Sequence, residues 1–193
     1  MLRSAYDWTM SFAAHKNAMW ALFLVAFIES SFFPIPPDIL LVPMILACRE
    51  KAWKIAAVCT LGSVLGGIAG YGIGFFLYEQ VGLPLLEFYG KTAKFTEFQT
   101  MYNEWGAWVV AMAGLTPFPY KVITIASGVT ALDLGTFIVA SVLSRGARFF
   151  LEAGLLWYFG NPIRDFIEKY LGWLVTIGFV VLFGGFLLVK YMF

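Results

Sequence analysis

The run from Ile55 to Tyr78 contains no charged residue, and this feature constrains the fold more than any other. About 20 predominantly apolar residues in a helix cross the hydrocarbon core of a bilayer. Thr136–Phe159 and Leu171–Phe193 are apolar over similar lengths, and the second of these is uncharged until Lys190. The sequence therefore predicts about three transmembrane helices.

The composition also indicates a membrane protein. Apolar residues make up 61% of the 193 residues, against about 45–50% in a soluble domain. Charged residues make up 13%, and the mean hydropathy is +0.80. So few charges could not cover so much apolar surface, which excludes a soluble enzyme, a disordered chain and a nucleic-acid-binding module. We expect a single all-α integral membrane domain over residues 1–193, with no nucleic-acid partner.

Two further apolar stretches, Asn17–Cys48 and Trp105–Ala131, are interrupted by prolines. Proline lacks a backbone donor and pushes the preceding residue out of helical geometry, so several prolines close together end a helix. Most arms beside the breaks are too short to cross a membrane alone. We expect two re-entrant helical hairpins, and two kinked full spans are the alternative. The breaks contain Pro34, Pro36, Pro37, Pro117 and Pro119.

The two breaks resemble each other, which predicts an internal repeat. Both contain a Pro-x-Pro sequence, and Asp38 after the first falls opposite Lys121 after the second. With one hairpin and one full span each, the repeats would start from opposite faces, and such an inverted repeat is a common build for transporters. The expected segments are repeat 1 (about 18–89), an interfacial amphipathic linker (about 82–104), repeat 2 (about 105–170) and a C-terminal helix (171–193).

The positions of lysine and arginine predict the orientation, since cytoplasmic loops carry an excess of both. With two hairpins, one side of the membrane receives seven basic residues and the other receives three. We therefore expect the N-terminus in the cytoplasm and the C-terminus outside, unless a hairpin is a full span. The first side has Arg3, Lys16, Arg49, Lys51, Lys54, Arg164 and Lys169, and the second has Lys91, Lys94 and Lys190.

Six charged residues lie in or beside apolar segments. A charge at the centre of a membrane helix costs about 2.5–3.5 kcal/mol on insertion scales, so these side chains should face a protein interior or a wet cavity and pair there. Arg148 and Glu152 are four residues apart on one helix face and could pair with each other. Arg145 would then be free, with Lys121, to meet a carboxylate or an anionic ligand. The six are Glu29, Asp38, Lys121, Arg145, Arg148 and Glu152.

The chemistry of these residues indicates phosphate binding and proton exchange. Lysine and arginine can receive a phosphate, so we assign Lys121, Arg145 and Arg148 to a lipid-phosphate site. Carboxyl groups in a low-dielectric groove can exchange protons, so we assign Glu29 and Asp38 to proton coupling. A buried ion-pair network that only holds two hairpins together is the alternative.

Gly62, Gly66, Gly70 and Gly74 form overlapping GxxxG repeats on one face of the uncharged helix. Small residues at this period let helix backbones approach closely. The contact could lie inside one chain or between two copies, so the sequence leaves a homo-oligomer open.

We expect no metal and no cofactor. His15 is the only histidine, and Cys48 and Cys59 are the only cysteines, so no cluster of metal ligands is visible. The sequence also lacks the GxSxG, Walker A and HExxH motifs. We therefore expect no catalytic residue and no enzyme activity.

The segment from Glu29 to Asp38, with Pro117–Lys121 and Ala126–Gly128, resembles the DedA membrane-protein family, also called the SNARE-associated or VTT family. The sequence looks most similar to its YqaA-like branch, over about residues 15–190. The resemblance implies two re-entrant hairpins in an inverted repeat. It also implies translocation of a phospholipid or of undecaprenyl phosphate across the bacterial inner membrane, linked to the proton gradient.

The resemblance also implies site residues. The two acidic positions of the family correspond to Glu29 and Asp38, which lie closer together here. Its second hairpin often carries two arginines, of which one corresponds to Lys121 and the other falls near Gly114. The arginines of the following helix would supply the missing positive charge.

Together these features predict a multi-pass inner-membrane transporter of a lipid phosphate, with membrane lipids as its partners. A proton-coupled transporter of a small solute or ion would use the same fold around a closed, water-sized cavity. A non-transporting membrane scaffold is the third hypothesis.

Overall fold

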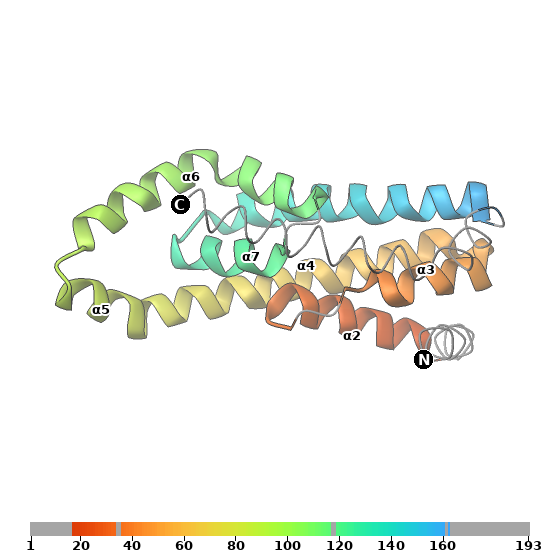
Figure 1. Cartoon of the computed structure of the whole chain (residues 1–193), viewed down its shortest axis with the longest axis horizontal. Helices are drawn as coiled ribbons and strands as arrows, with labels where there is room; N and C mark the ends of the chain where they lie inside the picture. Colours follow the sequence, from red (N-terminus) through yellow and green to blue (C-terminus); the bar gives the residue numbers. More distant parts are fainter. Residues whose placement is uncertain (1–16, 34–35, 117–118, 161, 163–193) are drawn as a thin grey trace.

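A computed structural model of the chain describes residues 17–33, 36–116, 119–160 and 162. Every regular element in these ranges is helical, and the helices form an elongated bundle (Figure 1). The elements are α2 (Ala18–Ser31), α3 (Asp38–Ala47), the 3₁₀ turn η1 (Arg49–Lys51), α4 (Ala52–Leu77), the π-helical η2 (Tyr78–Gly82), α5 (Leu83–Phe88), α6 (Thr92–Leu115), α7 (Tyr120–Val129) and a last helix, Leu134–Gly160.

Within these described ranges, two helical segments are long and apolar enough to cross a membrane. They are Arg49–Phe88, which includes α4, and Leu134–Gly160. They contain the first two spans that the sequence predicts. The third predicted span, Leu171–Phe193, lies outside the described residues.

Each of the two proline-containing stretches forms two helices instead of one, as predicted. The first stretch gives α2 and α3, and the second gives the end of α6 and all of α7. A proline directly precedes the first residue of α3 and of α7, where its missing N–H costs no helical hydrogen bond. Pro36, Pro37 and Pro119 lie in the breaks, whereas Pro34 and Pro117 are outside the described residues.

The broken helices lie against different halves of α4 (Figure 1). α2 packs along the first half of α4, and α7 packs along the second half. Both helices run in the same direction as α4, whereas α3 and α6 run in the opposite direction. The end of α2 and the beginning of α7 meet, because Thr124 Oγ1 donates a hydrogen bond to the backbone oxygen of Ser30 at 3.1 Å. Both breaks therefore lie near the middle of the bundle.

Glycines allow these close approaches to α4. A Cβ atom on Gly62 or Gly66 would collide with the backbone of α2, and one on Gly74 would collide with the backbone of α7. Gly70 lies where the two helices meet, against Thr124. The glycine face is covered within the chain, so the homo-oligomer that the sequence left open cannot form through this face without displacing α2 and α7.

The predicted linker is helical, but it is continuous with the arm that follows it. α6 runs without interruption from Thr92 to Leu115, so the expected boundary at Trp105 falls inside one helix. The physical reason is that no proline occurs between Thr92 and Leu115, and the helix continues until the prolines of the second break.

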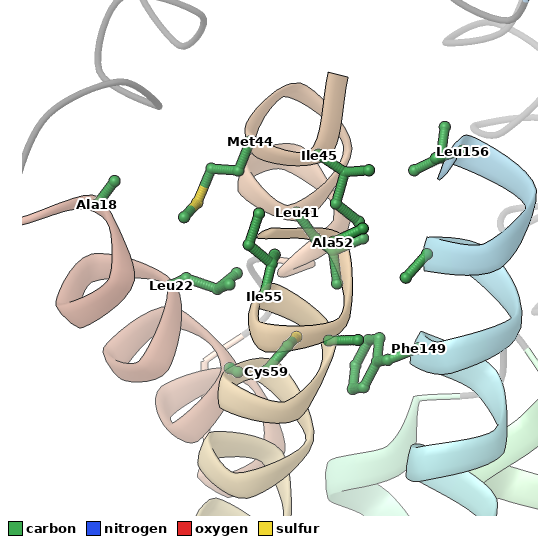
Figure 2. Packing of buried hydrophobic residues seen from close by; sticks show 13 residues of the cluster. Ala18, Leu22, Leu41, Met44, Ile45, Ala52, Ile55, Cys59, Phe149 and Leu156 are labelled. Atoms are coloured by element: carbon green, nitrogen blue, oxygen red, sulfur yellow. The ribbon is translucent and has the colours of Figure 1, made fainter. Parts of the chain in front are cut away.

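The larger apolar core lies near the first break. Figure 2 shows Leu41 and Ile45 of α3 beside Ile55 and Cys59 of α4, with Phe149 of the last helix extending toward them. This cluster places α3 next to the last helix, although the two are far apart in the sequence.

Candidate functional site

Arg145 is buried between several helices and has polar partners on two of them. Only 1% of its side chain is exposed, and its Nη2 donates to Glu29 Oε2 at 3.2 Å. Its Nε donates to Ser63 Oγ at 2.7 Å. A single side chain of the last helix therefore binds both α2 and α4.

Two aromatic rings enclose the same guanidinium. The Cζ atom of Arg145 lies 4.8 Å from the ring centroid of Tyr120 and 4.7 Å from that of Phe149. Cation–π contacts contribute about 0.5–2 kcal/mol each, more when they are desolvated. Tyr120 is the first residue of α7, so the second break determines where this ring lies.

Asp38 and Arg148 form a second ion pair. Arg148 Nη2 donates to Asp38 Oδ2 at 2.9 Å, and the exposed fractions of the two side chains are 28% for Asp38 and 27% for Arg148. Asp38 is the first residue of α3, and a carboxylate is favoured at a helix N-terminus. This pair is more open than the pair formed by Arg145.

The helical spacing allowed an ion pair between Arg148 and Glu152, and this prediction is wrong. Arg148 instead binds Asp38, which lies 110 residues earlier in the chain. The apolar packing of α3 against the last helix brings this carboxylate within reach. Glu152 remains close to this pair, because it lies one helical turn after Arg148 on the same face of the last helix.

Serine side chains that the sequence analysis did not single out complete the site. Ser30 donates to Glu29 at 3.1 Å, and the hydroxyls of Ser30 and Ser63 lie 2.8 Å apart. Ser31 donates to the backbone oxygen of Gly66 at 3.0 Å. Two serines directly after an acidic residue, and one beside the glycine face, were the sequence signal for these contacts.

Lys121 lies outside the two ion pairs. It is the second residue of α7 and is half-buried. No acidic side chain in the described ranges pairs with it. Of the five charged side chains that the sequence assigned to function, the structure brings four together as ion pairs.

Two apolar pockets lie away from these charges. One is formed by η2, α5 and α6, and the other by α6 and α7. In the part of the chain that the structure describes, no group of three His, Cys, Asp or Glu side chains could hold a metal ion.

The fold and the site define a class of protein: a helical chain that has, among its described residues, two helices able to cross a membrane, and in which one of them forms ion pairs with the broken helices α2 and α3. The chain is 37% identical over 175 residues to an uncharacterized protein of Haemophilus influenzae, covering 89% of this chain and 91% of that protein. It is 36% identical over 182 residues to an uncharacterized protein of Histophilus somni, covering 92% and 94%. The chain belongs to the same family as these proteins.

A more distant relative comes from an archaeon. An uncharacterized protein of Methanocaldococcus jannaschii is 27% identical over 130 residues, which is 67% of this chain and 78% of that protein. No family model matches the chain, and no solved structure matches it.

Proposed function

We propose that this protein is a multi-pass transporter of the bacterial inner membrane that moves a lipid phosphate in a proton-coupled manner. The observation that carries the proposal is that two ion pairs, Glu29–Arg145 and Asp38–Arg148, join the first broken element to an apolar helix. Ionisable residues within membrane segments are costly, and by default they mark a substrate or ion path.

The distribution of polar and apolar residues supports a membrane environment. On the last helix Arg145 is buried, whereas Leu143 and Leu151 are 66% and 65% exposed. On α4, Ser63 is fully buried, whereas Phe76 is 62% exposed. Apolar surfaces of this extent are unfavourable in water and are favourable against lipid tails.

The lengths of three of the four helices beside the breaks support two re-entrant hairpins in an inverted repeat, whereas the fourth helix, α6, contains 24 residues. α2, α3 and α7 contain 14, 10 and 10 residues, or roughly 15–21 Å at 1.5 Å per residue, which is less than the ~30 Å hydrocarbon core. Non-helical backbone at membrane depth is tolerated where protein surrounds it. The resemblance of the breaks to the DedA family implies the same arrangement and supports a lipid substrate.

The geometry supports different roles for the basic residues. Lys121 pairs with no acidic side chain in the described ranges, and Arg148 is partly exposed, so we assign the phosphate to these two. Arg145 is enclosed, so in this proposal it holds Glu29 in place and does not touch the phosphate. Glu29 and Asp38 exchange protons, because protonation of either carboxylate weakens its ion pair.

Lipid movement in reconstituted liposomes tests the proposal. We expect the wild-type protein to move a fluorescent phospholipid between leaflets, and Lys121→Gln to slow this by about tenfold, equivalent to about 1.4 kcal/mol. Lys94→Gln, at an exposed position of α6, is the matched control. Equal rates for the two lysine variants would contradict the phosphate role of Lys121.

The same assay tests the proton role. In the double variant Glu29→Gln, Asp38→Asn we expect lipid movement to lose its response to an imposed pH gradient. Normal gradient-dependent movement in this variant would refute the proton role. Uptake of soluble inorganic phosphate without lipid movement would instead support a small-solute transporter.

A non-transporting scaffold is the competing function, and the enclosure of Arg145 favours it. A guanidinium that is 1% exposed and held by α2, α4 and two rings suits a fixed structural network. In a scaffold, Arg145→Lys would impair folding and cellular function together, with no transport defect in the fraction that still folds.

A further inference from the structure

The two carboxylate oxygens of Asp38 have different surroundings. Oδ2 accepts a hydrogen bond from Arg148, whereas Oδ1 is buried and has no hydrogen-bond partner among the described residues. A buried carboxylate oxygen without a donor is destabilising, and such atoms are rare in native structures. The position of Oδ1 therefore requires an explanation.

Glu152 supplies that explanation. It follows Arg148 by four residues on the same face of the last helix, and Arg148 binds Asp38 at 2.9 Å, so the carboxyl groups of Glu152 and Asp38 lie close together. Ionised carboxylates only accept hydrogen bonds, so two of them cannot satisfy each other. The contact becomes a hydrogen bond when one carboxyl group holds a proton and donates it to the other.

The charges around this contact favour one bound proton. Three carboxyl groups and two guanidinium groups gather here, so the fully ionised cluster has one excess negative charge. Glu29 occupies the guanidinium of Arg145, and Asp38 occupies that of Arg148, so no guanidinium in the described ranges forms an ion pair with Glu152. One proton on the pair neutralises the cluster. The groups that face the pair are Arg145 and Arg148 on the last helix and the free thiol of Cys59 on α4, and Glu29 of α2 lies behind Arg145 as its ion-pair partner.

We propose that Asp38 and Glu152 bind one proton between them, which makes Glu152 a proton-binding residue. The proton comes from water and returns to water, and no other bond forms or breaks. When the proton leaves, the two carboxylates repel each other and compete for Arg148, which weakens the contact between α3 and the last helix. Asp38 and Arg148 are partly exposed, so the pair lies at the edge of the bundle and not in its fully buried core.

This inference deepens the proton coupling proposed above and depends on it only for the consequence in transport. Proton binding itself can be measured on the purified full chain, with no lipid movement involved.

Infrared difference spectroscopy in detergent micelles tests the proton site. We expect the wild-type protein at neutral pH to show the carbonyl band of a buried carboxylic acid. Glu152→Gln should abolish this band, because glutamine donates its own N–H to Asp38 and holds no proton. Asp38→Asn should abolish the same band, whereas Glu79→Gln, at an exposed carboxyl of η2, should retain it. The absence of the band from the wild type, or its persistence in Glu152→Gln, would overturn the proposal.

Thermal unfolding across pH gives a second measurement. In the wild type the unfolding temperature should fall as rising pH removes the shared proton. Glu152→Gln keeps a donor at every pH, so this step should disappear from its profile and remain in that of Glu79→Gln. Identical profiles for Glu152→Gln and Glu79→Gln would contradict the proposal.

The outcomes separate this inference from the transport proposal. A wild-type protein that shows the band but moves no lipid supports the shared proton and overturns transport. Loss of the band in Glu152→Gln together with unchanged proton-dependent lipid movement supports the shared proton and contradicts its part in coupling.

Discussion

At the residue scale, Arg145 shows how one side chain can join several helices. Its guanidinium contacts Glu29 of α2, Ser63 of α4 and the ring of Tyr120 at the start of α7. A buried guanidinium is tolerated when its hydrogen bonds are completed by partners of this kind. Removing either member of the ion pair leaves an uncompensated charge inside the bundle.

We predict that Arg145→Met lowers the free energy of unfolding by about 3–5 kcal/mol, because the Glu29 carboxyl group then loses its ion-pair partner. Adding Glu29→Gln should restore part of this loss, since the unpaired charge is removed. Reversible unfolding in mixed micelles measures both. Lys94→Met, at an exposed position, should change stability by less than about 0.5 kcal/mol. A double variant no more stable than Arg145→Met would show that the two side chains are not coupled.

At the scale of elements, the packing of α4 depends on which glycine faces another backbone. Gly66 lies directly against the backbone of Phe27 in α2, whereas a Cβ atom at Gly72 would meet nothing within 4 Å. The two glycines lie on the same helix, so intrinsic helix propensity does not distinguish them. Only the contact of Gly66 with α2 distinguishes the two glycines.

We predict opposite effects of alanine at these two positions. Gly66→Ala should lower the free energy of unfolding by roughly 1–3 kcal/mol, because the added methyl group collides with backbone that cannot move alone. Gly72→Ala should raise it by about 0.4–1 kcal/mol, because alanine restricts the unfolded chain. Thermal unfolding of both variants in the same detergent measures this. A Gly66→Ala variant as stable as Gly72→Ala would refute the close contact of α2 with α4.

The last helix begins with a capping residue that predicts a pH effect. The backbone N–H of Thr136 donates to Asp133 Oδ1 at 2.7 Å, and the Thr136 hydroxyl donates to the same oxygen at 2.8 Å. These hydrogen bonds hold the pKa of the Asp133 carboxyl below its ordinary value. The ionised cap therefore stabilises the folded state above the ordinary pKa, and this contribution is lost as the pH falls through the lowered value.

We expect Asp133→Asn to remove this acid-dependent step, because asparagine also caps a helix and does not titrate there. Unfolding temperatures of the wild type and the variant, compared from neutral to acidic pH, measure the effect. Parallel profiles for the two proteins would contradict it.

At the scale of the whole molecule, long-range contacts link the first broken element to the last helix. The two ion pairs join residues 116 and 110 positions apart. α2 with α3, and α6 with α7, each turn back near the middle of α4 (Figure 1). If these are re-entrant hairpins, the two ends of each broken stretch lie on the same side of the membrane.

Labelling of single cysteines from outside intact cells tests this topology. In a chain lacking Cys48 and Cys59, we expect the two sites that flank the first hairpin to be protected from a membrane-impermeant maleimide until the cells are permeabilised. The two sites that flank the second hairpin should react at once. Opposite accessibility within either pair would show a kinked full span instead of a hairpin. The substitutions are Asn17→Cys and Glu50→Cys for the first pair, and Lys94→Cys and Asp133→Cys for the second.

Much of the helical layout could be predicted from the sequence because its causes are local. Consecutive prolines end helices wherever they occur, and an uncharged run such as Ile55–Tyr78 is long enough to cross a bilayer without help from other segments. The boundary expected at Trp105 lies inside α6 for a local reason too, since aromatic spacing indicates a helix face but does not end a helix.

The sequence by itself determined where the helices break, which segments are apolar enough to span, and that the charges among them need partners. Only the tertiary structure decided which partners they take. Arg148 binds Asp38 instead of Glu152, and the glycine face meets α2 and α7 of the same chain. The physical reason is that helix ends and hydropathy depend on near neighbours, whereas ion pairs and close backbone contacts depend on distant segments that packing brings together.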